Sequence, residues 1–128
     1  MELRQHIAAC SGHLEQIGAG YRREFNFPES FPGFDGHFPG NPILPGVIQT
    51  LLGEICSFEA LEKEYPGEKM RLETVTRGKF MRPVKPGEKL TLDLSLKTKD
   101  AKRISICTLR VYGETAASYQ LIFVREEE

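Results

Sequence analysis

Hydrophobic and polar residues alternate through the second half of the chain, and this pattern predicts strands. Between positions 89 and 97 every second residue is a leucine, which places the leucines on one face of a strand. A strand over 21–27 is predicted in the same way, because Tyr21, Phe25 and Phe27 fall on one face. The other predicted strands cover 71–79, 80–84, 103–112 and 116–125.

One long helix is predicted between the first strand and the others. It begins at Gly46 or Val47, directly after a proline, and continues to about Leu61 with no proline inside. Its apolar residues cover much of the circumference, which predicts burial on most sides. A short helical turn is predicted over 3–9, and the rest of the segment 1–20 is weakly defined.

This order of elements predicts an α+β fold in a single domain, 1–128, with a curved antiparallel sheet wrapped around one long central helix. A chain of 128 residues is long enough for one buried core but too short for two ordinary ones. One sheet around one helix leaves an edge and a face uncovered. We therefore expect a homodimer or a higher homo-oligomer.

Composition and charge exclude several classes of protein. The formal net charge of -1 argues against a nucleic-acid binder. No apolar run approaches the length of a membrane span, so a cytoplasmic location is expected. The three cysteines are far apart and lack metal-ligand spacing, so no metal site is predicted. Eleven of the 17 lysines and arginines fall between Lys69 and Arg103, which indicates either a basic face or solvated strand edges.

The loop that precedes the long helix is the strongest candidate for a functional site. It covers 28–46, and a loop of that length in a small domain is usually functional. His37 follows Gly36 and precedes three prolines, so its backbone is restrained. Imidazole titrates near pH 6.5, which suits a general base. The alternative is a purely structural histidine.

Two sequence blocks resemble those of the hot-dog-fold 3-hydroxyacyl-[acyl-carrier-protein] dehydratases. The first runs from Gly36 to Val47, Gly-His-Phe-Pro-Gly-Asn-Pro-Ile-Leu-Pro-Gly-Val, and is similar to the active-site motif of that family. The second runs from Gly78 to Leu90 and is similar to the segment that those enzymes carry after the helix. The resemblance covers roughly 21–124, and Gln49 is among the residues that point to the aryl-polyene-type branch.

The resemblance implies a dehydration of 3-hydroxyacyl thioesters to trans-2-enoyl thioesters. His37 matches the family histidine, the base for the C2 proton. The amide of Gly46 or Val47 would stabilise charge on the thioester oxygen, as free helix N-terminal N–H groups do, unless Gly46 merely ends the loop. The family carboxylate stands fourteen residues after the histidine, where this chain has Leu51. Glu54 is the nearest acid on the helix, about 4.5 Å further along the axis, and is the candidate to protonate the departing hydroxyl. The alternative is that Glu54 pairs with a basic residue or faces solvent, and that His37 moves the proton itself through water.

The resemblance also implies a substrate and partners. The acyl chain would be carried on the phosphopantetheine arm of an acyl carrier protein, with no metal or organic cofactor. Val47 and Leu51 would help to line the acyl site, and Arg82 and Lys85 would dock the acidic carrier. Two other functions stay open: a non-catalytic, dehydratase-like subunit that binds acyl carrier protein, suggested by Leu51, and a hot-dog acyl thioesterase.

Overall fold

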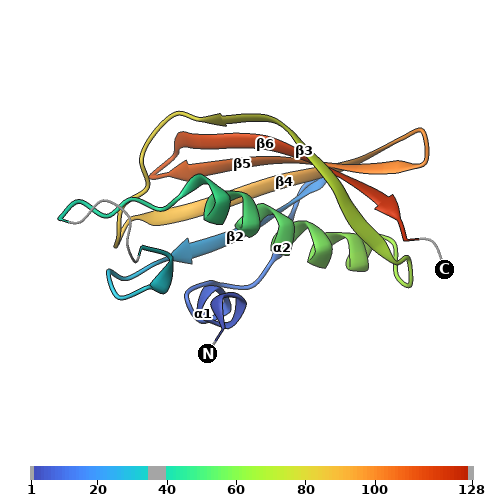
Figure 1. Ribbon diagram of the computed structural model, residues 1–128. Coiled ribbons are helices and arrows are strands. Elements are labelled where there is room, and N and C mark those ends of the chain that lie inside the picture. The colour runs from blue at the N-terminus through green and yellow to red at the C-terminus, as the bar shows by residue number, and fades with distance from the viewer. Residues whose placement is uncertain (1, 35–39, 127–128) are drawn as a thin grey trace.

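Strands β1 to β6 form one antiparallel sheet in the computed structural model, which describes residues 2–34 and 40–126. The order across the sheet is β1-β2-β4-β5-β6-β3. β6 is therefore the last strand in the sequence but lies between β5 and β3 (Figure 1). The bounds are β1 Glu15–Ile17, β2 Gly20–Asn26, β3 Met70–Phe80, β4 Lys89–Lys99, β5 Lys102–Val111 and β6 Glu114–Arg125.

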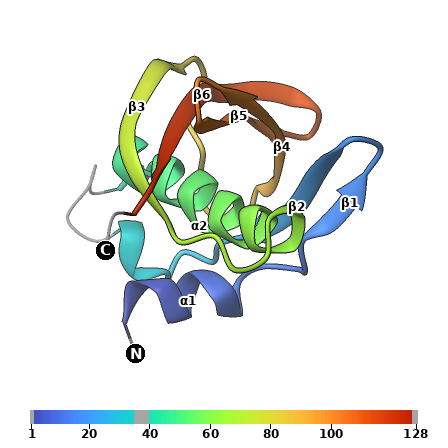
Figure 2. The same cartoon turned by 90° about the vertical axis from the view of Figure 1, so that its right-hand side faces the viewer.

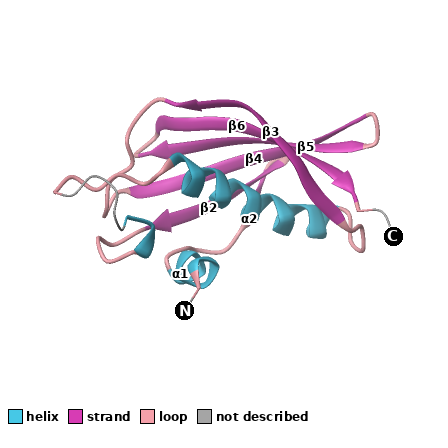
Figure 3. Ribbon diagram, in the orientation of Figure 1, coloured by secondary structure: helices cyan, strands magenta, loops and turns pink. Residues whose placement is uncertain are grey.

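The long helix α2 (Gly46–Glu64) lies along the concave side of the sheet, which curves around it (Figure 2). A second helix, α1 (Leu3–Ala9), lies on the other side of α2 from β5 and β6. A short 3-10 turn, η1 (Pro32–Phe34), follows β2. Figure 3 shows the strands of the sheet in magenta and the helices in cyan. The predicted α+β architecture is confirmed.

The alternating pattern of β4 explains how the sheet packs on α2. Leu90, Leu92 and Leu94 are buried, whereas the residues between them are partly exposed. The aromatic residues predicted to share a face of β2 behave in the same way, and all three are buried. These side chains join one hydrophobic core with the apolar residues of α2, β5 and β6.

The side of α2 that faces the sheet is defined by its contacts with β5 and β6. The hydroxyl of Ser57 donates a 2.7 Å hydrogen bond to Oγ of Ser105 on β5. The backbone of Gly53 lies against the ring of Tyr119 on β6. The predicted burial on most sides of the helix is confirmed over 46–61, where only Val47, at 75% exposure, and Glu59 are exposed.

Two tight turns join the last three strands. Lys99 pairs with Lys102, and Val111 pairs with Glu114, so each hairpin loop has two residues. Both residues of each loop have positive φ: 52° and 67° at Asp100 and Ala101, 49° and 83° at Tyr112 and Gly113. That conformation matches the right-handed twist of the flanking strands.

The prediction of a separate strand over 80–84 is wrong, because β3 runs from Met70 only to Phe80. The amides of Met81 and Arg82 both donate to the carbonyl of Ala116, at 2.8 and 3.2 Å. Pro83 has no N–H to give to a ladder. The amide of Leu44 donates to the carbonyl of Val84 at 2.8 Å. The segment therefore forms a loop beside the chain that leads into α2.

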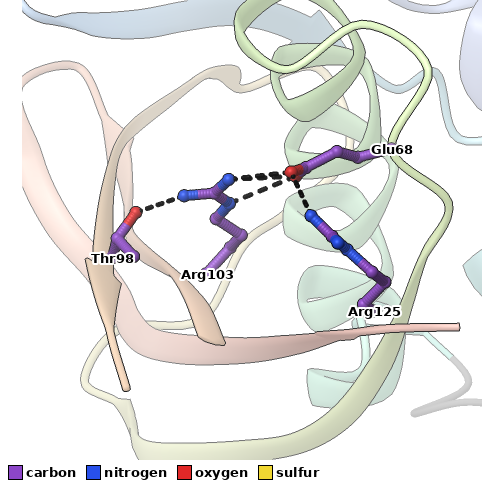
Figure 4. A network of polar contacts seen from close by, with 4 residues as sticks. All are labelled: Glu68, Thr98, Arg103 and Arg125. Atoms are coloured by element: carbon purple, nitrogen blue, oxygen red, sulfur yellow. Dashed lines mark hydrogen bonds and ion pairs between the residues drawn. The ribbon is translucent and has the colours of Figure 1, made fainter. Parts of the chain in front are cut away.

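An ion-pair network fixes the turn after α2 to the ends of β5 and β6 (Figure 4). The carboxylate of Glu68 accepts hydrogen bonds from the guanidinium groups of Arg103, at 3.0 Å, and Arg125, at 2.8 Å. Arg103 also donates to Thr98 and stacks over the ring of Tyr65, 3.6 Å from its centroid. These bonds lower the pKa of Glu68, with the hydrogen bond from Arg103 as the largest cause.

Candidate active site

The first turn of α2 presents backbone N–H groups at one end of the helix. Pro45 is the N-cap residue, in an extended conformation, and its carbonyl accepts from the amides of Ile48 and Gln49 at 3.1 and 3.0 Å. The N–H groups of Gly46 and Val47 precede the first intrahelical bond, and neither has an acceptor among the described residues. Such groups attract an anion or developing negative charge.

A hollow of about 300 Å³ opens beside this turn. A Cβ on Gly46 would lie 3.3 Å from the ring of Phe80, so glycine lets the helix start close to the end of β3. Most of the wall is apolar, which suits a thioester and its acyl chain. The lining residues are Ile43, Leu44, Pro45, Gly46, Gln49, Phe80, Met81, Arg82 and Pro83.

His37, the predicted base, lies outside the described residues, as does the rest of the segment 35–39. In the sequence it stands nine positions before Gly46, in the middle of the loop 28–46. Its role as the base stays a prediction. Of the other predicted substrate-binding residues, the structure places Gly46 in the hollow and leaves Val47 and Leu51 out of its lining.

Val47, Leu51 and Glu54 lie on the side of α2 that faces away from the sheet, as their helical spacing requires. Leu51 is partly buried against the core. The side chain of Glu54 is 24% exposed, and its Oε1 lies 3.8 Å from Nη2 of Arg4 on α1. The candidate acid is therefore paired with a cation on a different side of the helix from Gln49, which lines the hollow.

Arg82, predicted to dock a carrier protein, stands at the hollow but is already paired. Its guanidinium lies 2.8 Å from Glu88 and 3.5 Å from Glu114, and it donates to the carbonyl of Val111 at 3.4 Å. Lys85 is exposed, and its backbone N–H donates to Glu88 at 2.7 Å. Two carboxylates thus offset the charge of Arg82, while Lys85 presents its side chain to solvent.

Gln49, which lines the hollow, and Tyr119, which contacts Gln49, are buried polar residues that the sequence patterns did not assign to the site. Nε2 of Gln49 donates to the carbonyl of Leu44 at 2.9 Å, and the hydroxyl of Tyr119 donates to the carbonyl of Gln49 at 2.6 Å. Burial raises the pKa of Tyr119 well above its usual value, so the phenol stays protonated and donates. The available signal for Gln49 was a polar residue among the mostly apolar residues of the first two helical turns.

The described residues offer little other chemistry. Burial raises the pKa of the Cys56 thiol to about 12 and also raises that of Cys107, which makes both poor nucleophiles at neutral pH. Within 2–34 and 40–126 no three His, Cys, Asp or Glu side chains are grouped as metal ligands would be. None of the described helices is both long and apolar enough to cross a bilayer.

The chain is similar in sequence to two groups of dehydratases. It matches the ApeI-like family, described as ApeI dehydratase, over residues 3–119. It is 38% identical over 94 residues to a 3-hydroxyacyl-[acyl-carrier-protein] dehydratase FabZ of Oenococcus oeni, with 71% of this chain and 68% of the relative covered. A FabZ of Caldanaerobacter subterraneus subsp. tengcongensis is 32% identical over 109 residues, with 80% of this chain and 75% of the relative covered.

Solved structures share the fold. One is the dehydratase heterocomplex ApeI:P from Xenorhabdus doucetiae, of which one chain aligns with a TM-score of 0.67 and 24% identity over 90% of this chain and 96% of that one. Another is a crystal structure of the putative thioesterase yhdA from Lactococcus lactis, with a TM-score of 0.80 and 10% identity over the whole of both chains. At these identities the likeness concerns the fold alone.

Proposed function

Because this chain belongs to the ApeI-like dehydratase family, we infer that it is a lyase that dehydrates 3-hydroxyacyl thioesters carried on acyl carrier protein. The relatives at 32 to 38% identity carry that activity in their names. The observation that supports the chemistry in this chain is the pair of free amides at Gly46 and Val47, which stand beside a mostly apolar hollow. A thioester oxygen placed there would be stabilised as negative charge develops on it.

The reaction begins with the removal of a proton from C2 of the acyl group. We assign this step to His37, because a neutral imidazole is a base whose pKa lies close to physiological pH. The electron pair of the C–H bond moves toward the thioester carbonyl, and the oxygen gains negative charge opposite the amide of Gly46 or Val47. The pair then forms the C2–C3 double bond as the C3–O bond breaks. The hydroxyl takes a proton and leaves as water, giving the trans-2-enoyl thioester.

The departing hydroxyl needs an acid to protonate it. Leu51 occupies the position of the family carboxylate, and Glu54 is the nearest acid along α2. We propose Glu54 for this role, in a site completed by a second copy of the chain. Its pairing with Arg4 at 3.8 Å leaves the carboxyl partly accessible, at 24% exposure.

Turnover with a 3-hydroxyacyl carrier-protein substrate tests the function as a whole. The wild-type protein is expected to form the trans-2-enoyl thioester, to hydrate it in reverse, and to release no free thiol. His37→Ala should abolish both directions, whereas His13→Ala, in the N-terminal segment, should leave them unchanged. Free thiol release in place of enoyl product would indicate a thioesterase, and the absence of turnover with every chain length would reject the proposal.

Replacing Glu54 with glutamine tests the acid. Loss of a general acid costs about 10²- to 10⁴-fold in rate, so Glu54→Gln should lower kcat by at least about 100-fold. Glu62→Gln is the matched control, because Glu62 is exposed near the end of the same helix. Equal rates for Glu54→Gln and the control would remove Glu54 from the mechanism.

A second candidate function is a dehydratase-like subunit that completes the site of a partner. Leu51 in the carboxylate position and the pairing of Glu54 with Arg4 favour it. The ApeI:P structure carries the name of a heterocomplex, which makes such an assembly reasonable for this fold. Turnover that appears only after mixing with a carboxylate-bearing homologue, and that survives Glu54→Gln, would support this function over the first.

We propose the remaining partners on the same basis. The protein would act in the cytoplasm as a homodimer or higher homo-oligomer, without a metal or organic cofactor. Lys85 is the better of the two predicted docking residues for an acidic carrier, because Arg82 is engaged by Glu88 and Glu114. Lys85→Glu should raise KM for the carrier-linked substrate and reduce its dependence on salt. A KM unchanged from low to high salt would exclude electrostatic docking.

A further inference from the structure

The first turn of α2 is tied to the chain around it by two buried side chains, Gln49 and Tyr119. They come from elements far apart in the sequence. Gln49 is 4% exposed and Tyr119 is 2% exposed. Gln49 is on the helix itself, whereas Tyr119 comes from β6, the final strand. The Tyr119 side chain contacts the backbone carbonyl of Gln49, and the Gln49 side chain contacts the backbone carbonyl of Leu44.

Gln49 holds the loop that leads into the helix. Its Nε2 donates to the carbonyl of Leu44 at 2.9 Å, and the amide of Leu44 donates in turn to the carbonyl of Val84 at 2.8 Å. Leu44 and Gln49 both line the hollow. The amide side chain therefore fixes the distance between the helix and one wall of the candidate active site.

Tyr119 holds the helix against the sheet. Its hydroxyl donates to the carbonyl of Gln49 at 2.6 Å. Its ring fills the space beside Gly53, where a Cβ would overlap Cε1 and the hydroxyl oxygen. The bond and the close approach together limit both the sliding and the rotation of the first two turns of α2 against β6.

We propose that Gln49 and Tyr119 are positioning residues that aim the N–H groups of Gly46 and Val47 at the thioester oxygen. The inference rests on the oxyanion role proposed above for those amides. Neither side chain needs to touch the substrate. Misplacement of a catalytic group by about 1 Å can reduce a rate by about 100-fold, so a small shift of this turn has a large effect on turnover.

Packing alone does not account for an amide at position 49. Oε1 of Gln49 is buried and has no hydrogen-bond partner among the described residues, which is unfavourable for stability. Methionine has a similar shape and would remove the unpaired acceptor together with the donor. A glutamine that only filled space would therefore be replaceable by methionine at no functional cost.

The test compares Gln49→Met and Tyr119→Phe with wild type in steady-state turnover of a 3-hydroxyacyl carrier-protein substrate. Both variants should lower kcat by roughly 10- to 100-fold and leave KM within about two-fold, because the interaction they weaken forms only as charge develops. The pH profile should keep its shape near neutral pH, since burial raises the pKa of Tyr119 well above its usual value and Gln49 carries no titrating group. Tyr21→Phe is the control: it removes a tyrosine hydroxyl that contacts Glu64 at the other end of α2, and kcat should not change.

The outcomes separate this inference from the proposed function. Without wild-type turnover, the proposed function fails and this inference, which depends on it, fails with it. If the wild-type protein turns over, the positioning role is overturned by a folded Tyr119→Phe variant whose kcat equals that of wild type. It is also overturned if Tyr119→Phe raises KM and leaves kcat unchanged. If Gln49→Met unfolds, Tyr119→Phe alone decides, because it keeps the ring that packs on Gly53. Equal losses of kcat in Tyr119→Phe and Tyr21→Phe would also overturn the inference, since they would indicate a general effect on α2.

Discussion

Gly53 shows how one missing side chain sets the position of the helix at the site. A glycine inside a helix is normally less stable than alanine by about 1 kcal/mol, so propensity alone predicts that Gly53→Ala stabilises the protein. The space at this position is filled by Tyr119, however, and a Cβ would overlap its ring. Overpacking of a buried contact of this kind costs about 1–3 kcal/mol.

We therefore expect Gly53→Ala to destabilise the fold by about 1–3 kcal/mol, measured by urea denaturation. Gly12→Ala is the control, because a Cβ there would lie 3.9 Å from the nearest atom, the carbonyl oxygen of Glu24, which is an ordinary contact. It should change stability by no more than about 0.5 kcal/mol. A stabilised Gly53→Ala protein would contradict the close packing of α2 on β6.

Individual residues of the candidate site were predictable from sequence only where a local sequence pattern indicated them. Gly46, which lines the hollow, follows the proline that starts the helix. Prolines and glycines mark the loop that holds His37, whose place in the site stays a prediction. Tyr119 gave no such signal, because it alternates with neighbours like any other inward residue of a strand. Its partner lies 70 positions earlier in the sequence, and only the folded structure brings the two together.

At the scale of elements, the two hairpin turns carry backbone strain of different amounts. Gly113 adopts its positive φ readily, whereas Ala101 at 67° holds a side chain in the left-handed region. That conformation costs about 1–2 kcal/mol for a residue with a Cβ, and glycine avoids the cost at the price of a more flexible unfolded chain.

Ala101→Gly should accordingly raise stability by about 0.5–1 kcal/mol, seen as a higher Tm in thermal unfolding. The same exchange at Ala8, exposed in the helix α1, should lower stability by a similar amount, because glycine weakens a helix. The change in Tm is therefore expected to be positive for Ala101→Gly and negative for Ala8→Gly. A lower Tm for Ala101→Gly would show that the turn is not strained.

The element boundaries show where a sequence pattern is sufficient and where it is not. The helix over 3–9 and the leucine-rich strand β4 were predictable, because their periodicity is local. The end of the strand within 80–84 was not predictable, since the apolar residues of this segment resemble those of a strand. The amides of Met81 and Arg82 both bond to the carbonyl of Ala116, and Pro83 has no N–H to donate. Burial around α2 was predicted correctly except at Val47, whose exposure hydrophobicity alone does not indicate.

For the whole molecule, the network around Glu68 predicts a dependence of stability on pH. It connects the turn after α2 to the ends of two strands (Figure 4). Hydrogen bonds from Arg103 and Arg125 hold the pKa of Glu68 below its ordinary value of 4.5. A carboxyl whose pKa is lower in the folded state stabilises that state above the unfolded pKa, and the contribution disappears as the pH falls through the folded pKa.

Thermal unfolding of wild type and Glu68→Gln between pH 7 and pH 3 tests this expectation. The Tm of wild type should exceed that of the variant at neutral pH, and the difference should shrink as the pH falls below 4.5. Glu73→Gln, which removes one exposed pair with Lys102, is the control and should have a smaller effect at neutral pH. A difference in Tm between wild type and Glu68→Gln that stays constant down to pH 3 would contradict a stabilising contribution of the ionised Glu68 carboxylate.

The place of β6 in the sheet has a consequence for biosynthesis. The strand made last must insert between two strands made earlier, pairing with β5 on one side and β3 on the other. Until it leaves the ribosome, β3 has no strand partner among the described residues, and the side of α2 that packs on Tyr119 stays open to water. Completion of the sheet therefore waits for β6, and premature termination before β6 yields a polypeptide that chaperones and proteases will recognise.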